Sequence, residues 1–93
     1  MELTLFYLPG CPYCRRAEQI ITRLLQEHPD YAAVPLRRVN ELTARAEAQS
    51  RDYWYVPSLF LGDRKLYEAD PAESAQQMEA HIDAAFRAAL GTA

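Results

Sequence analysis

Both cysteines of this chain, Cys11 and Cys14, stand in the motif C-P-Y-C, directly after an apolar run over residues 3–8. Large side chains on both alternations of that run predict a strand buried on both faces, as at the centre of an α/β sheet. A Pro-Gly pair breaks the strand. Pro12 suits the first turn of a helix, where its missing N–H is not needed. The two thiols are therefore expected where a central strand ends and a helix begins.

The next part of the chain predicts a parallel βαβ unit. Apolar residues at helical spacing indicate a helix that ends before His28 and Pro29. Residues 34–39 are typical of an edge strand, and a helix between two strands implies that they run parallel. Asn40 is expected to cap a second helix, from Glu41 to about Arg51.

The second half predicts a hairpin and a last helix. Two strands, over residues 58–61 and 64–67, flank a Gly-led turn. The sequence D-P-A-E from Asp70 is a helix start with a side-chain cap, a proline and a carboxylate. We predict an α/β fold of order β-α-β-α-β-β-α, in a single domain over residues 1–93.

Composition excludes several classes of function. A net charge of −3 provides no basic surface for nucleic acid and no polybasic signal for a membrane. No apolar run approaches the roughly 18–20 residues that span a bilayer, and the first residues lack a signal peptide's positive region. Two cysteines are too few for the disulfide framework of a small secreted domain. We expect a cytoplasmic protein with neither nucleic acid nor membrane as a partner.

The cysteine spacing predicts redox chemistry. Free N–H groups and the partial positive charge at a helix N-terminus stabilise a thiolate over a thiol. Arg15 and Arg16 add positive field in the same turn, which would tune the thiol pKa. Cys14, one helical turn on, is placed to attack a mixed disulfide formed on Cys11. Cys11 is thus the expected nucleophile and Cys14 the resolving cysteine.

A zinc site is the structural alternative for a C-x-x-C pair. Such a site needs two more ligands at fitting spacing. The candidates are His28 and His81, which are far apart and lack a paired motif. We therefore predict no metal and no resident cofactor.

Pro57 provides the second clue to the site. A proline at the first residue of a strand is allowed, but a cis Val56–Pro57 bond beside the dithiol is the sharper hypothesis. The backbone of Val56 would then be free to pair with an extended substrate. The preceding aromatic residues, 53–55, are expected to be partly core and partly a groove for a protein or peptide.

C-P-Y-C near the start, V-P in the middle and the predicted element order together resemble the glutaredoxin branch of the thioredoxin fold. The resemblance covers nearly the whole chain. It implies a four-stranded mixed sheet flanked by three helices, with Pro57 as the family's cis-proline. It also implies a disulfide-bearing protein or small thiol as substrate, and glutathione as a candidate reductant. The implied substrate-binding residues are Pro12, Tyr13, Tyr55, Val56, Pro57 and Asp70.

The chain departs from glutaredoxins at the glutathione cradle. The family usually carries T-V-P before the hairpin and G-G-x-D after it. Here Tyr55 replaces the threonine, and Tyr67 and Glu68 replace the two glycines, whereas Asp70 matches the aspartate. The added bulk and negative charge would oppose anionic glutathione.

The sequence therefore predicts a thiol–disulfide oxidoreductase that reduces protein or mixed disulfides, with glutathione or a thioredoxin-type reductase as electron donor. Three alternatives remain open. The chain could be a glutathione-independent, thioredoxin-like electron carrier. It could instead be a non-enzymatic iron–sulfur carrier, or a binding module whose dithiol senses redox state.

Overall fold

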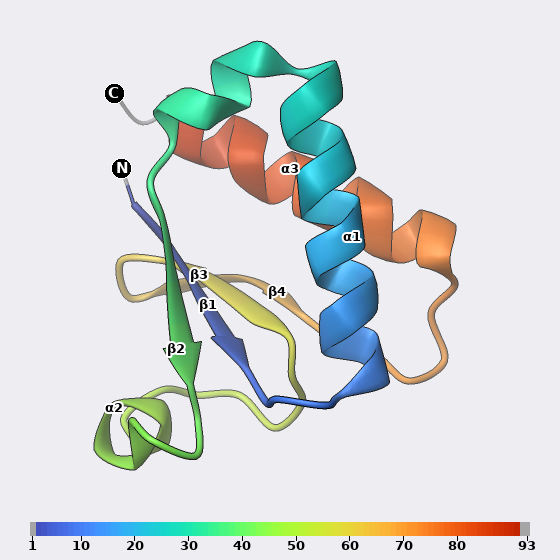
Figure 1. Ribbon diagram of the computed structural model, residues 1–93. Coiled ribbons are helices and arrows are strands. Elements are labelled where there is room, and N and C mark those ends of the chain that lie inside the picture. The colour runs from blue at the N-terminus through green and yellow to red at the C-terminus, as the bar shows by residue number, and fades with distance from the viewer. Residues whose placement is uncertain (1, 92–93) are drawn as a thin grey trace.

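Four strands form one mixed sheet in the order β2-β1-β3-β4 (Figure 1). The computed structural model describes residues 2–91, and its strands are β1 (Leu3–Tyr7), β2 (Leu36–Asn40), β3 (Ser58–Leu61) and β4 (Arg64–Glu68). β1 pairs in parallel with β2 and antiparallel with β3. β3 and β4 form the predicted antiparallel hairpin, which turns at Gly62 with a positive φ of 60°. β1 is therefore a central strand, as expected.

Three α-helices and one short 3-10 helix complete the fold: α1 (Pro12–Glu27), η1 (Pro29–Ala33), α2 (Arg45–Gln49) and α3 (Ala75–Gly91). α1 and α3 lie together over one face of the sheet, whereas α2 lies apart from them (Figure 1). The sequence did not predict η1, although it did predict that the preceding helix ends before Pro29. The predicted α/β class and element order are confirmed.

The sheet has an apolar core on each face, because β1 is buried on both. The larger core lies under α1 and α3 and includes Leu3, Leu5, Ile21 and Phe86. The smaller core consists of Phe6, Val39 and Phe60, with Tyr53 and Val56 among the partly buried residues packed against it. Burying large side chains of this kind contributes about 1.5–3 kcal/mol each. β1 is thereby fixed between two packed layers.

The second helix is shorter than the predicted span from Glu41 to about Arg51. Asn40 is the last residue of β2, and its side chain accepts the N–H of Leu42 at 2.9 Å within a turn. That turn delays the helix until Ala44, which offers no side-chain cap. The edge strand is likewise shifted from the predicted 34–39 to 36–40, because Val34 closes η1.

The last helix also begins later than predicted from Asp70. Asp70 Oδ1 accepts the N–H of Ala72 at 2.9 Å, which forms a turn instead of a helix. Ser74 supplies the cap: its hydroxyl accepts the N–H of Gln77 at 3.1 Å, and the Gln77 side chain accepts the N–H of Ser74 at 2.8 Å. This reciprocal pair is a capping box. The predicted helix start at Asp70 was therefore wrong, because the helix begins after this turn, at Ala75.

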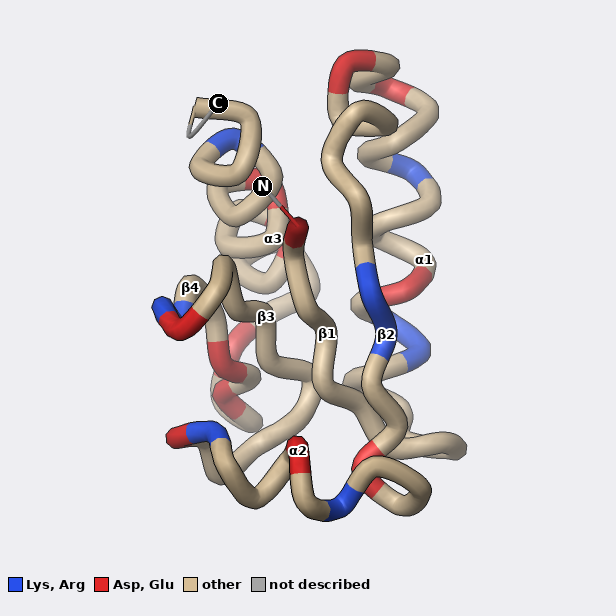
Figure 2. The backbone as a smooth tube through the Cα atoms, turned by 90° about the vertical axis from the view of Figure 1, so that its left-hand side faces the viewer, with Lys and Arg blue, Asp and Glu red and all other residues tan. Residues whose placement is uncertain are grey.

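Charged residues lie along the outside of the fold, where Figure 2 marks their positions on the backbone, and several of them form ion pairs between elements or within a helix. Arg38 on β2 pairs with Glu18 on α1, with Nε and Oε2 at 2.8 Å, and Arg87 pairs with Asp83 within α3 at 3.0 Å. Exposed pairs of this kind contribute little stability singly, about 0–1 kcal/mol. Within residues 2–91, no helix has both the length and the apolar character needed to cross a membrane.

Candidate dithiol site

Cys11 is the N-cap residue of α1. Its backbone is extended, and its sulfur accepts the N–H of Cys14 at 3.4 Å. Gly10, which precedes it, adopts a positive φ of 77°, a conformation that glycine reaches without steric cost. The Cys11 side chain is partly exposed at the carboxyl end of β1, where ligand sites form in open α/β sheets. The predicted placement of Cys11 between strand and helix is confirmed.

Cys14 lies one helical turn further on and is buried, with 5 % of its surface exposed. The pKa of its thiol is raised from the ordinary 9.0 to about 12, mainly by burial and in smaller part by Cys11 and Glu41. Cys14 is therefore a protonated thiol at neutral pH. The two cysteines are both free, yet they differ sharply in access to solvent.

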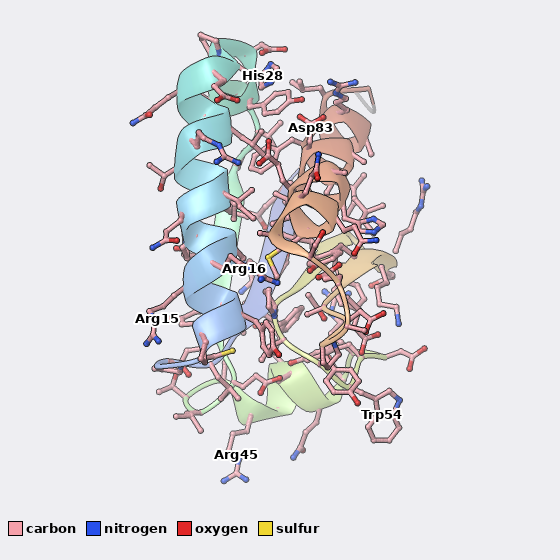
Figure 3. The ribbon with its side chains drawn as sticks, turned by 90° about the vertical axis from the view of Figure 1, so that its right-hand side faces the viewer. Arg15, Arg16, His28, Arg45, Trp54 and Asp83 are labelled. Carbon is pink, nitrogen blue, oxygen red and sulfur yellow. The ribbon has the colours of Figure 1, made fainter. Side chains whose placement is uncertain are left out.

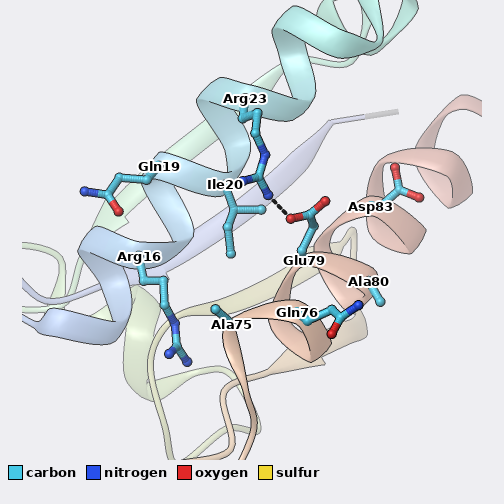
Figure 4. A pocket seen from close by; sticks show the side chains of 9 residues that line it. All are labelled: Arg16, Gln19, Ile20, Arg23, Ala75, Gln76, Glu79, Ala80 and Asp83. Carbon is cyan, nitrogen blue, oxygen red and sulfur yellow. Dashed lines mark ion pairs between the residues drawn. The ribbon is translucent and has the colours of Figure 1, made fainter.

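The two arginines of the first turn bind groups other than the cysteine sulfurs. Arg15 Nη1 donates to the carbonyl of Gly10 at 3.5 Å. The Arg16 guanidinium lies 5.6 Å from the centre of the Tyr13 ring, and its side chain reaches towards Ala75 at the start of α3 (Figures 3 and 4). Within residues 2–91, no hydrogen bond joins either guanidinium to a cysteine sulfur. Any effect of these two guanidinium groups on the thiols is therefore a through-space electrostatic effect.

Arg16 is held without a hydrogen-bonding partner. Its Nε and Nη2 atoms are buried and make no hydrogen bond within the described part of the chain. The residue lines a cavity of about 710 Å³ between α1 and α3, which the ion pair of Arg23 and Glu79 closes on one side (Figure 4). This cavity does not include either cysteine. The sequence offered no signal for it.

The Val56–Pro57 peptide bond is cis, as hypothesised. β3 begins at the next residue, Ser58, which pairs with Phe6, so this bond lies beside the carboxyl end of β1. The Pro57 carbonyl accepts the N–H of Ala69 at 3.0 Å. The N–H and C=O of Val56 have no hydrogen-bonding partner within residues 2–91. They are available to an extended ligand.

The aromatic segment divides between core and surface, as expected. Tyr53 packs against Phe6, with ring centres 5.1 Å apart, and its hydroxyl donates to Glu41. Trp54 and Tyr55 face solvent, with exposed fractions of 89 % and 54 %. Figure 3 shows Trp54 projecting from the end of the molecule that carries the dithiol.

Glu68 holds this segment in place, a role that the sequence did not predict. Its Oε2 accepts the N–H groups of Trp54 at 2.6 Å and Tyr55 at 2.9 Å, and its Oε1 pairs with Lys65 at 2.9 Å. Burial alone would raise the pKa of Glu68, but these hydrogen bonds and the charge of Lys65 hold it below its ordinary value. No local pattern could have revealed the contact, since it joins residues from two elements.

Asp70 lies apart from the cysteines. It lines a cavity of about 550 Å³ together with Tyr67, Glu68 and Glu73, whereas Cys11 and Cys14 line another of about 370 Å³ with Arg15. Tyr67 donates its hydroxyl to Glu73, and burial raises its pKa above the ordinary value. The structure thus brings Arg15 into the cysteine cavity and leaves Asp70 outside it.

Neither histidine lies in a group of potential metal ligands. His28 stacks on Tyr31 with ring centres 4.7 Å apart, and His81 stacks on Tyr67 at 5.6 Å. In residues 2–91, no three His, Cys, Asp or Glu side chains gather where they could hold a metal ion.

Comparison with known proteins places the fold. No family model and no curated protein sequence matches the chain. Among solved structures, it is similar to thioredoxin 1 from Thermosipho africanus, with a TM-score of 0.61, 10 % identity, and coverage of 95 % of this chain and 97 % of that one. A malarial protein is similar at a TM-score of 0.60 and 16 % identity, over 89 % of this chain and 93 % of that one.

Two larger proteins share the same architecture in part. The first two thioredoxin domains of Saccharomyces cerevisiae Eps1p are similar at a TM-score of 0.57 and 17 % identity, over 96 % of this chain and 35 % of that one. Human ERp44 in a zinc-bound form is similar at a TM-score of 0.57 and 20 % identity, over 89 % of this chain and 25 % of that one. The chain therefore has the thioredoxin fold. It carries a C-P-Y-C dithiol at the carboxyl end of its central strand.

Proposed function

We propose that this chain is a thiol–disulfide oxidoreductase of the dithiol, glutaredoxin-like type. The observation that carries the proposal is the asymmetry of the two cysteines. Cys11 is partly exposed at a helix N-terminus, whereas Cys14 is buried behind it with a pKa of about 12. The Cys11 sulfur can react directly with a substrate, whereas the Cys14 sulfur can react only after a mixed disulfide has formed on Cys11.

In the first step, the Cys11 thiolate attacks one sulfur of a substrate disulfide. The substrate S–S bond breaks, a bond forms between Cys11 and the attacked sulfur, and the leaving thiolate takes a proton from water. The free N–H groups of the first turn of α1, with the N–H of Cys14 directed at the Cys11 sulfur, favour the negative charge on it.

In the second step, Cys14 loses its proton to solvent and its sulfur attacks Cys11. The mixed disulfide breaks, the second substrate thiolate leaves and takes a proton from solvent, and Cys11 and Cys14 become disulfide-bonded. The substrate has gained two electrons and two protons. Forming the mixed disulfide removes the charge and the hydrogen bond of Cys11, two of the causes that raise the pKa of Cys14. The pKa of the Cys14 thiol is therefore lower in the mixed disulfide than in the reduced protein, which favours the second step.

The substrate would lie along the residues beside the dithiol. The unpaired backbone groups of Val56 can add an extended segment by strand-like hydrogen bonds. Tyr13 and Tyr55 are exposed and offer aromatic surface, and Pro12 is exposed beside Tyr13. The Pro57 side chain is buried, so Pro57 would act by shaping the backbone of Val56. Asp70, which lies on a different cavity, is assigned no direct contact with the reacting sulfurs.

One observation favours a dithiol reductase over glutathione as the electron donor. Where glutaredoxins have two glycines, Tyr67 is buried and Glu68 is partly buried, and both side chains are held by hydrogen bonds. The carboxylate of Glu68 already occupies two backbone N–H groups beside the cis-proline. A glutathione carboxylate would meet a negative charge there instead of bare backbone.

The proposal is tested first by a single turnover. Reduced protein, freed of reductant, is mixed with hydroxyethyl disulfide, and we expect rapid formation of the Cys11–Cys14 disulfide with release of mercaptoethanol. Cys11→Ser should give no release, and Cys14→Ser should stop at the mixed disulfide. If the wild-type protein reacts no faster than Cys11→Ser, the proposal is wrong.

The donor is then identified with the oxidised protein. One arm supplies glutathione, glutathione reductase and NADPH; the other supplies NADPH and thioredoxin reductase; Cys11→Ser is the blank. We expect faster NADPH consumption in the second arm. Faster turnover in the glutathione arm would mean that the tripeptide binds despite Tyr67 and Glu68.

A further inference from the structure

Arg16, in the first turn of α1, is a cation that the fold encloses without a hydrogen-bond acceptor. Its Nε and Nη2 atoms are buried, and within residues 2–91 neither makes a hydrogen bond. Arg16 also forms no ion pair with a carboxylate in that part of the chain. Removing a cation from water is costly unless a group of negative potential faces it. Some other part of the fold must therefore stabilise this charge.

The face of the Tyr13 ring is the group that does so. Tyr13 and Arg16 are three positions apart on α1, a spacing that brings side chains together on one face of a helix. The guanidinium carbon of Arg16 lies 5.6 Å from the centre of the ring, within the roughly 6 Å over which a cation is attracted to an aromatic face. The attraction is stronger for a desolvated cation than for an exposed one. The Tyr13 ring and the buried guanidinium therefore hold each other in place.

Two other elements enclose the Arg16 side chain. It runs from α1 towards Ala75, the first residue of α3 (Figure 4). The pKa of Tyr67 is raised by burial and by Glu73, and the charge of Arg16 acts in the opposite direction, so the guanidinium lies near this ring as well. Glu73 accepts the Tyr67 hydroxyl and forms no ion pair with Arg16. Arg16 is thus confined between α1, α3 and β4.

The carboxylates that share a cavity with Arg16 have cations of their own. Glu79 and Asp83 both line the cavity between α1 and α3. Glu79 pairs with Arg23, and Asp83 pairs with Arg87 at 3.0 Å. Neither carboxylate competes with the aromatic ring for the Arg16 guanidinium.

Tyr13 is also the aromatic residue nearest to Cys11 along the chain. It stands between Pro12 and Cys14 in the C-P-Y-C motif, and 38 % of its surface is exposed. A side chain that is already held in place loses little conformational entropy when a ligand packs against it. The exposed part of this ring is therefore a preformed apolar wall beside the nucleophile.

We propose that Arg16 is a positioning residue for substrate recognition. It fixes the Tyr13 ring as a wall beside Cys11, and this wall selects disulfides that carry a large apolar side chain next to the reacting sulfur. The inference rests on the proposed function, because the selected group belongs to the disulfide that Cys11 attacks. It adds a substrate class to that function, namely peptide or protein disulfides flanked by an apolar residue.

Two synthetic peptides test this selection. Each has one cysteine, blocked as a mixed disulfide with mercaptoethanol, and the residue next to it is leucine in one peptide and serine in the other. Each rate is divided by the rate of the same peptide with dithiothreitol, which corrects for intrinsic reactivity. Below saturation, single-turnover rates with the reduced wild-type protein should be about fivefold higher for the leucine peptide, as expected for burying roughly 40 Å² of apolar surface. The corrected limiting rates at saturation should be equal, because the wall acts on binding.

Variants of Arg16 then show whether the wall depends on its charge. Arg16→Met removes the charge, and should reduce the leucine-to-serine ratio to about twofold or less. Arg16→Lys should keep most of the ratio, because an ammonium group also binds to an aromatic face. The matched control is Arg23→Met, which lies on the same helix, lines the same cavity and loses its ion pair with Glu79. This control should keep the wild-type ratio.

A double variant shows whether Arg16 acts through Tyr13. Tyr13→Ser should itself lower the ratio, and adding Arg16→Met should have no further effect in that background. Melting temperatures establish that each variant is folded under the conditions of the assay.

Hydroxyethyl disulfide, which has no neighbouring side chain, separates this inference from the proposed function. Failure of the wild-type protein to react with it would overturn the proposed function. Normal reaction with it, combined with a wild-type ratio near one or an unchanged ratio in Arg16→Met, would overturn the role of Arg16 alone. An equal loss of the ratio in Arg23→Met, or a further loss when Arg16→Met is added to Tyr13→Ser, would overturn it as well.

Discussion

Glu68 accepts the backbone N–H of Tyr55 at 2.9 Å, across thirteen positions of sequence. The same oxygen accepts the N–H of Trp54, so one carboxylate fixes the two exposed aromatic residues beside the cis-proline. The shape of the surface beside the cis-proline therefore depends on a residue at the end of β4, which lines a different cavity from the two cysteines.

Removing that carboxylate should loosen the aromatic segment. Glu68→Ala leaves two N–H groups without their charged acceptor, and we expect a loss of about 1–2 kcal/mol in the free energy of unfolding. Trp54 is the one tryptophan of the chain, so its fluorescence anisotropy reports directly on the segment and should fall. Glu27→Ala, which removes an exposed carboxylate at the end of α1, is the matched control. Unchanged anisotropy in Glu68→Ala would show that packing alone orders the segment.

The two cysteines should differ in their reaction with an alkylating agent. Raising the pKa of Cys14 from 9.0 to about 12 lowers its thiolate fraction at neutral pH about 1000-fold relative to an unperturbed thiol. Iodoacetamide at pH 7 should therefore modify Cys11 and leave Cys14 intact. Peptide mapping by mass spectrometry measures the two sites. Comparable modification of both in folded protein would contradict the burial of Cys14.

Alkaline pH should destabilise the reduced protein. The pKa values of Cys14, Tyr53 and Tyr67 are all raised in the folded state, mainly by burial. Above about pH 9, the unfolded chain releases these protons while the folded chain retains them, so the free energy of unfolding falls as pH rises. Melting temperatures between about pH 7 and 11 should decline, and Tyr67→Phe should decline less steeply. A flat profile for the wild type would contradict this account.

Tyr31 and Asp83 should be coupled in stability. The Tyr31 hydroxyl donates to Asp83 at 2.5 Å and accepts from Arg87 at 3.1 Å, which ties η1 to α3. Tyr31→Phe should lower the free energy of unfolding by about 1–2 kcal/mol. A double-mutant cycle with Asp83→Asn, measured by urea denaturation, should give a coupling of about 0.5 kcal/mol or more. Strict additivity of the two substitutions would show that the bond adds nothing to stability.

The parts of the fold that follow local rules were predictable. An apolar run without alternation identified β1 as buried on both faces, and the Gly-led turn identified the hairpin. Cys11 could be placed at a helix start because Pro12 and the preceding Pro-Gly pair leave few other choices. The sequence also supported the cis bond at Pro57, which the structure has.

Predictions failed where two local signals competed. Asn40 and Asp70 each have the side chain of a helix cap. Each instead accepts the backbone N–H of the residue two positions on, which forms a turn in place of a helix start. Ser74, at which no helix start was predicted, forms the capping box with Gln77. A Ser followed three residues later by Gln was a usable signal for it.

The contacts that shape the site's surroundings come from tertiary structure and had no sequence signal. Glu68 meets Trp54 only because the hairpin brings the end of β4 next to the segment that enters β3. Arg16 reaches α3 instead of the sulfurs because α1 and α3 pack side by side. Such contacts depend on which elements meet, and composition or spacing does not specify that.

The start of β1 and the end of α3 lie together, at the end of the molecule opposite the dithiol (Figure 1). Leu3 and Gly91 mark these two positions. A linker attached near either one would leave Cys11 facing outward. The protein could therefore be fixed by either end to an electrode or a resin and still present its thiols to solution, which suits it to direct electrochemistry.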